Sequence, residues 1–99
     1  MSDSARTVHL PVIHEHPTTG SGAGRPYHVI LYNDDSHAFD VVVRQVRKAT
    51  GVSTDEAFAI TFCAHASGRA VCYAGAHAAC EHVADILREI ALQVEVDRA

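Results

Sequence analysis

Residues 27–35 read Tyr-His-Val-Ile-Leu-Tyr-Asn-Asp-Asp. The first six residues are mostly aromatic, β-branched or aliphatic, and such a run is typical of a strand over Tyr27–Tyr32. The last three carry side chains that compete for backbone hydrogen bonds and therefore favour turns and helix caps. The stretch predicts a strand that ends in a polar loop.

Two helices are predicted after this loop. From about Ala38 the apolar residues recur at helical spacing, and Gly51 supplies the stop. These apolar positions are Phe39, Val42, Val43 and Val46. Ser53-Thr54-Asp55-Glu56 is a capping-box sequence, so a second helix is expected from there to about Ala66, with Gly68 ending it.

The rest of the chain predicts strand, helix and strand. Arg69–Tyr73 is β-rich, the apolar residues from Ala76 to about Ile90 have helical spacing, and Leu92–Val96 alternates apolar with polar residues. The predicted order is β-α-α-β-α-β. We therefore expect an α+β fold, a single small domain with a three-stranded antiparallel sheet and three helices on one face.

The N-terminal quarter of the chain differs in composition from the rest. Residues 1–26 lack periodicity and end in a stretch rich in Gly, Ser and Thr, which is typical of a linker. We expect 1–26 to be a flexible N-terminal extension and 27–99 to be the folded domain.

Composition narrows the class of function. The formal net charge of −4 argues against nucleic-acid binding, which needs clustered Lys and Arg. The three cysteines cannot all pair, and they suit small core positions in a reducing compartment. No apolar run is long enough for a membrane span, and the N-terminus lacks the order of a signal peptide. These features predict a soluble, cytoplasmic monomer without a cofactor.

Asn33, Asp34 and His65 form the candidate site, with Asp35 beside it. Taken alone, Asn-Asp-Asp after a strand is a turn and cap, and a single His is more often solvated or part of the core. If the two helices pack as a hairpin, however, the first begins near the point where the second ends. An amide carbonyl, a carboxylate and an imidazole then converge, and these groups can accept hydrogen bonds from a protonated α-amino group.

The pattern resembles the ClpS family, the N-degron adaptors of bacterial Clp proteases. The likeness rests on the strand followed by Asn-Asp-Asp at 27–35, the spacing from Asn33 to His65, the segment Gly68–Cys72, and Glu81 in the third helix. It covers about Tyr27 to Val96.

The resemblance implies roles for particular residues. Asn33, Asp34 and His65 would bind the α-amino group and first peptide unit of a substrate, with Asp35 near the site. Glu81 would contact a Clp AAA+ unfoldase of the ClpA or ClpC type, to which substrates beginning with Phe, Tyr, Trp or Leu are delivered. The apolar pocket for the first side chain would be formed by His37, Phe39, Val42, Thr61 and Ala64.

Four of these pocket positions depart from the family pattern. The family usually has Thr at the position of His37, Met at the positions of Phe39 and Thr61, and Val at that of Ala64. Thr61 and Ala64 remove side-chain volume, so the pocket should be deeper and slightly more polar. A deeper pocket favours Trp, Tyr or Phe over Leu, because an underfilled cavity loses dispersion contacts.

Other readings stay open at this stage. A protein-interaction domain of the same fold, similar in architecture to the C-terminal domain of the ribosomal stalk protein, could have altered or lost N-terminus recognition. A metal could use His14 with His16, or Cys63 with His65, but a structural zinc site needs two such pairs with suitable spacing. Cys63 and His65 are two apart on a predicted helix, so they cannot form a nucleophilic dyad directly. No metal site and no enzymatic activity are expected.

Overall fold

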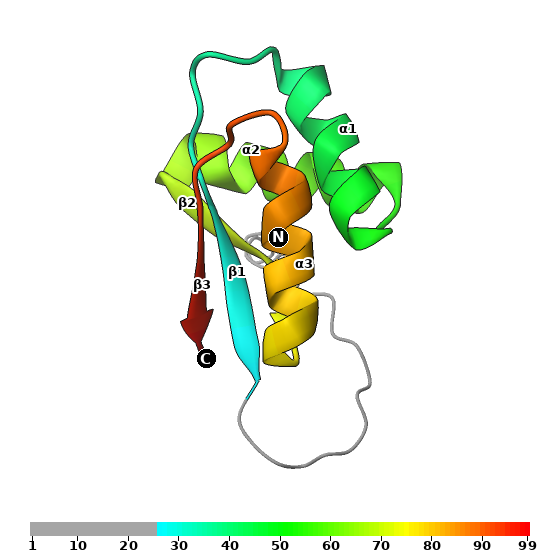
Figure 1. The fold of residues 1–99 in the computed structure, drawn as a ribbon. Helices are drawn as coiled ribbons and strands as arrows, with labels where there is room; N and C mark the ends of the chain where they lie inside the picture. The colour runs from blue at the N-terminus through cyan, green and yellow to red at the C-terminus, as the bar shows by residue number, and fades with distance from the viewer. Residues whose placement is uncertain (1–25) are drawn as a thin grey trace, which may run out of the picture.

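The computed structural model describes residues 26–99, and its elements follow the predicted order (Figure 1). The extension expected over 1–26 therefore lies outside the described residues except for Pro26. The elements are β1 (Tyr27–Tyr32), α1 (Phe39–Thr50), α2 (Thr54–Ser67), β2 (Arg69–Gly75), α3 (His77–Arg88) and β3 (Val94–Arg98). None of the helices in residues 26–99 is long and apolar enough to span a membrane.

The sheet has the order β2-β1-β3, and both pairings of the central strand β1 are antiparallel. Val29 and Leu31 of β1 are almost fully buried, whereas the alternate residues of the strand are half-buried. On β3, Val96 lies opposite Val29 and Val94 lies opposite Leu31. This alternation gives the sheet one apolar face, as expected of a small sheet that is covered on one side.

The predicted bounds of the last strand were wrong by two residues. The alternating residues begin at Leu92, but β3 begins at Val94. Leu92 lies in the preceding turn, where its N–H group donates to the carbonyl oxygen of Leu87 and its side chain is only 3% exposed. Leu92 is thus a core residue for a reason other than strand alternation, which explains why the pattern extended too far back.

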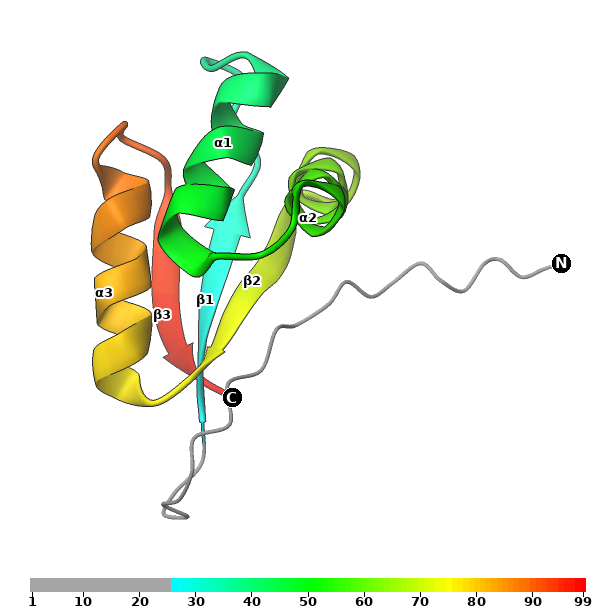
Figure 2. The ribbon, with the colours of Figure 1, turned by 90° about the vertical axis from the view of Figure 1, so that its right-hand side faces the viewer.

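The helices and the sheet enclose one core. Figure 2 shows α1 passing in front of the strands, α3 alongside β3, and α2 seen end-on beside β2. A core built largely from valine, alanine and leucine explains how a domain with few aromatic residues can fill its interior. The largest fully buried side chains are Leu31, Ile60, Leu87, Val29, Val46, Cys72 and Cys80.

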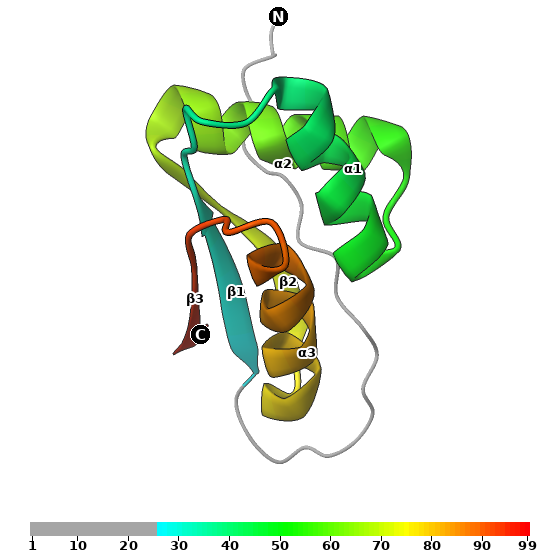
Figure 3. The ribbon, with the colours of Figure 1, turned by 45° about the horizontal axis from the view of Figure 1, so that its top comes forward.

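The ends of α2 determine where the site lies. Ser53 caps its start, because the Ser53 side chain accepts a hydrogen bond from the Glu56 N–H group at 3.1 Å. Gly68 ends it in the left-handed conformation, with φ of 97°. The Gly68 carbonyl oxygen then accepts a hydrogen bond from the Asn33 N–H group at 2.9 Å. The loop after β1 is thereby attached to the C-terminal end of α2, and Figure 3 shows this loop crossing α2 on its way to α1.

Candidate functional site

A pocket of about 250 Å³ lies where the loop after β1 meets the first turns of α1 and the second half of α2. It collects residues that are more than thirty positions apart in the sequence. Its lining residues are Tyr32, Asn33, Asp34, Asp35, His37, Phe39, Val42, Thr61 and His65.

Asp34 organises the loop that forms the polar rim. Its Oδ1 atom accepts hydrogen bonds from the Ser36 N–H group at 3.1 Å and from the Ser36 hydroxyl at 2.7 Å. Its Oδ2 atom contacts Nδ1 of His37. The contact with Asp34 holds the side chain of His37, which lines the pocket. The Asp34 carboxylate stays partly exposed, with 15% of its side-chain surface accessible.

The environment of Asp34 favours its ionised form. Partial burial raises its pKa, but the hydrogen bonds from Ser36 and the contact with His37 lower it by more. The net result is a pKa below the usual value for an aspartate. A negative charge is therefore present at the pocket throughout the neutral pH range.

Two further acceptors lie at the same pocket. The Asn33 side-chain amide nitrogen donates to Oδ1 of Asp35 at 3.3 Å, which leaves its carbonyl oxygen as the acceptor of that amide. His65, exposed near the end of α2, supplies an imidazole. Asn33, Asp34 and His65 thus line one pocket, as the helix-hairpin argument required.

The deeper part of the pocket is less polar. Val42 and Thr61 are both 5% exposed and come from α1 and α2. The Thr61 hydroxyl donates to the Ala57 carbonyl oxygen of the same helix at 2.8 Å, so this donor is already satisfied within α2. Phe39, at the start of α1, adds an aromatic side chain that is half-buried.

The predicted pocket residues and the lining differ at two positions. Ala64 was predicted to line the pocket, but it is 3% exposed, belongs to the core and is absent from the lining. Tyr32 lines the pocket and was read only as a strand residue. Its position directly before Asn33 could have indicated this, because a residue next to the candidate site in sequence also lies close to it in space.

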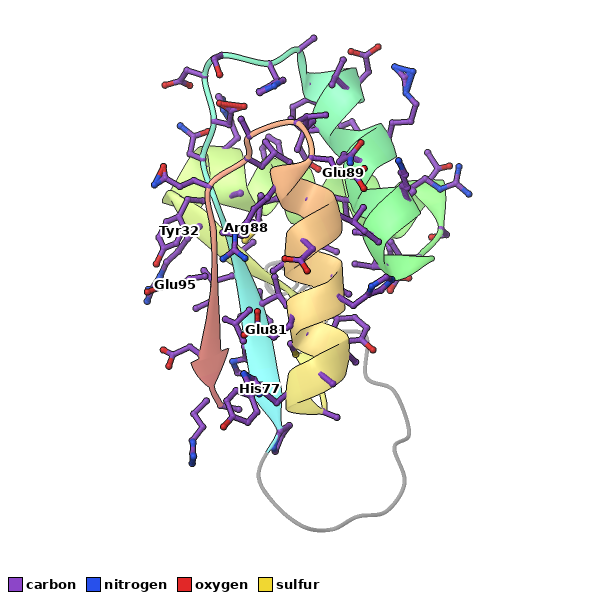
Figure 4. The ribbon with its side chains drawn as sticks, viewed as in Figure 1. Tyr32, His77, Glu81, Arg88, Glu89 and Glu95 are labelled. Atoms are coloured by element: carbon purple, nitrogen blue, oxygen red, sulfur yellow. The ribbon has the colours of Figure 1, made fainter. Side chains whose placement is uncertain are left out.

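Tyr32 and Glu81 make contacts of their own. The Tyr32 hydroxyl donates to the Glu95 carboxylate of β3, and this hydrogen bond raises the pKa of Tyr32 (Figure 4).

Glu81 lies on α3 and is not part of the pocket lining. Its Oε2 atom is 3.1 Å from Nε2 of His77, one turn earlier on the same helix (Figure 4).

The three cysteines are free, and Cys72 and Cys80 are buried. Burial raises the pKa of Cys72 to about 12, so this thiol stays protonated and unreactive at neutral pH. Within residues 26–99, no group of three or more His, Cys, Asp or Glu side chains could hold a metal ion. His14 and His16 lie outside the described residues.

Comparison with known families gives the pocket a context. Residues 23–95 match the model of a family described as ATP-dependent Clp protease adaptor protein ClpS. The chain belongs to the ClpS family. This membership confirms the resemblance carried by the strand-loop and helix motifs, and it places the protein among adaptors rather than enzymes.

A solved ClpS structure has the same fold. It is "The structure of Agrobacterium tumefaciens ClpS2 bound to L-phenylalaninamide", which matches with a TM-score of 0.71 and 21% sequence identity. The match covers 76% of this chain and 98% of that chain. At this identity the likeness supports the fold alone. No curated protein matches this sequence.

Proposed function

We propose that this ClpS-family chain is an N-degron adaptor that binds the free α-amino group and bulky first side chain of its substrates. Asn33, Asp34 and His65 are assigned to the α-amino group. The observation that carries the proposal is that one pocket joins these three groups to the apolar side chains of Phe39 and Val42.

The chemistry of an N-terminus matches this arrangement. A protonated α-amino group carries one positive charge and three N–H donors, and the pocket offers an ionised carboxylate, an amide oxygen and an imidazole. An internal peptide bond has no such charge. A site of this kind therefore distinguishes the first residue of a chain from every later one.

The size of the pocket agrees with a single side chain. Its volume of about 250 Å³ is below the range of roughly 300–1,000 Å³ that is usual for drug-sized ligands. The related ClpS2 structure is bound to L-phenylalaninamide, a one-residue ligand with a free α-amino group and a phenyl side chain. By analogy, we assign His37, Phe39, Val42 and Thr61 to the first side chain, with aromatic residues preferred over Leu.

Delivery is the second half of the proposed role. The partner is a Clp AAA+ unfoldase of the ClpA or ClpC type, contacted through the α3 surface that carries Glu81, and the protein acts as a cytoplasmic monomer. Glu81 is half-exposed and lies outside the pocket, so a partner could reach it while a substrate is bound. A Glu81→Lys variant should bind peptides normally and bind the unfoldase more weakly.

Fluorescence anisotropy with labelled peptides tests substrate recognition. Peptides that begin with Phe, Trp, Tyr, Leu or Met are each compared with an N-acetylated twin of the same sequence. We expect micromolar or tighter binding to the bulky free N-termini, lost on acetylation and lost again in His65→Ala. If no free N-terminus binds, the proposal is wrong, and the chain would be a protein-interaction domain of the same fold with altered N-terminus recognition.

A further inference from the structure

Phe58 and Phe62, on α2 beside the pocket, are the only large hydrophobic side chains among residues 26–99 that stay exposed, at 52% and 53%. Neither lines the pocket. Scattered exposed hydrophobic residues are common on soluble proteins, so exposure alone indicates nothing. What separates the two is a contact that Phe58 makes.

Phe58 packs against Phe39. The two ring centroids are 4.9 Å apart with an interplanar angle of 60°, an edge-on arrangement. This geometry is among those that aromatic pairs prefer, and it restricts the orientation of both rings. Phe39 lines the pocket and Phe58 does not, so the contact connects an exposed residue of α2 to the wall of the pocket on α1.

The orientation of Phe39 matters most for an aromatic ligand. A ring is attracted to another ring only in certain relative orientations, whereas an aliphatic side chain needs only close contact. A wall ring held in one orientation therefore favours aromatic first residues over Leu. A wall ring free to turn loses that advantage and keeps most of its contact with Leu.

We propose that Phe58 is a positioning residue that orients Phe39 and thereby makes the pocket selective for aromatic first residues. The inference rests on the proposed N-terminus recognition and adds a specificity determinant that does not touch the substrate. Phe58 acts through Phe39, so its effect requires Phe39 to be present.

The test measures dissociation constants for Phe- and Leu-initiated peptides and takes their ratio. In Phe58→Ala, we expect selectivity for Phe over Leu to fall about threefold to tenfold, the size of an aromatic pair contribution. Phe58→Tyr keeps the ring and should keep the wild-type ratio. Phe62→Ala is the matched control, because it removes an equally exposed ring from the same helix.

A double-mutant cycle separates positioning from a general effect on α2. In a Phe39→Ala background, Phe58→Ala should leave the ratio unchanged, since no wall ring remains to orient. Aromatic NMR signals of Phe39 should move in Phe58→Ala and stay in place in Phe62→Ala, whether or not a peptide is present.

Three results would overturn the inference. They are an unchanged ratio in Phe58→Ala, an equal loss in Phe62→Ala, and a full effect of Phe58→Ala without Phe39. In each case the wild-type protein still binds free N-termini, so the proposed function stands. Absence of binding by the wild type overturns the proposed function and this inference together.

Discussion

Two connections lie at the same end of the sheet and are built in different ways (Figure 1). The loop between β1 and α1, residues 33–38, is held by its own side chains, with Asp34 bound to Ser36 and His37. The turn between α3 and β3, residues 89–93, is held mainly by backbone hydrogen bonds and by the buried side chain of Leu92, and Lys48 Nζ donates to Glu89 Oε1 at its first residue. The Tyr32 N–H group donates to the Gln93 carbonyl oxygen at 3.0 Å and joins the two connections.

The first connection supplies groups for ligand binding, and the second contributes to the stability of the core. Polar side chains in the 33–38 loop fold that loop and also face the pocket, so their chemistry is available to a ligand. The 89–93 turn presents no side chain to the pocket and contributes to the core instead. Changes in the first connection should therefore alter binding more than stability, and changes in the second should do the reverse.

Leu92→Ala should give the largest effect on stability. The Leu92 side chain is 3% exposed, and truncating a buried leucine costs about 2–5 kcal/mol because a cavity remains. Urea denaturation measures the loss, and peptide binding under conditions where the variant is folded should match the wild type. Gln93→Ala, at an exposed neighbouring position, is the control and should change stability by less than about 0.5 kcal/mol. Weakened peptide binding by folded Leu92→Ala would contradict the view that the 89–93 turn affects stability rather than binding.

Asp34→Asn tests the other connection. It keeps the shape of the side chain but removes the charge, and hydrogen bonds to charged groups contribute about 1.5–3 kcal/mol. We expect the dissociation constant for a Phe-initiated peptide to rise by about tenfold or more. Asp40→Asn, an equal charge change at an exposed α1 position outside the pocket, should have little effect. Equal losses in the two variants would mean that overall charge, rather than Asp34, attracts the peptide.

The same comparison shows what could be predicted from sequence. Periodicity and glycine stops predicted every helix and strand, because the core of this domain follows local spacing. The loop residues Asn33 and Asp34 and the distant His65 were recognisable as a candidate set from residue type and spacing. Their meeting in one pocket depended on the packing of α1 against α2, which the sequence only suggested.

The errors have tertiary causes. Leu92 fits strand alternation, but a backbone turn places it in the core before the strand begins. Ala64 is part of the core cluster and does not appear among the residues that line the pocket. The contact between Phe39 and Phe58 joins two helices, so no local pattern predicts it.

The Asp34 carboxylate should also make the stability of the folded protein depend on pH. The pKa of Asp34 in the folded protein lies below its ordinary value of about 4. Asp34 therefore contributes stability above about pH 4, and this contribution is lost as pH falls through the depressed pKa. The side chain is partly exposed, so the contribution should be at most about 1 kcal/mol.

Urea denaturation of the wild type and Asp34→Asn at pH 6 and pH 3 measures this contribution. The difference between the two proteins should shrink at pH 3, because below the ordinary aspartate pKa the unfolded wild-type chain binds a proton more readily than the folded protein does. Leu92→Ala carries no such group, so its loss should be the same at both pH values. A constant difference for Asp34→Asn would mean that the loop does not depend on the charge.

The smallest expected effect concerns Ala91, in the backbone-held turn. With φ of 66°, it is the only non-glycine residue of the described chain in the left-handed region. An L-residue there is strained by about 1–2 kcal/mol, and Ala91→Gly relieves this strain while adding freedom to the unfolded chain, at a cost of about 0.5–1 kcal/mol. The net result should be a gain in stability of about 0.5 kcal/mol with unchanged peptide binding. Ala59→Gly, at an exposed position inside α2, should lower stability by about 1 kcal/mol. If Ala91→Gly raises stability while Ala59→Gly lowers it, the positive φ of Ala91 strains the folded protein. A loss of stability in both variants would show that Ala91 is not strained.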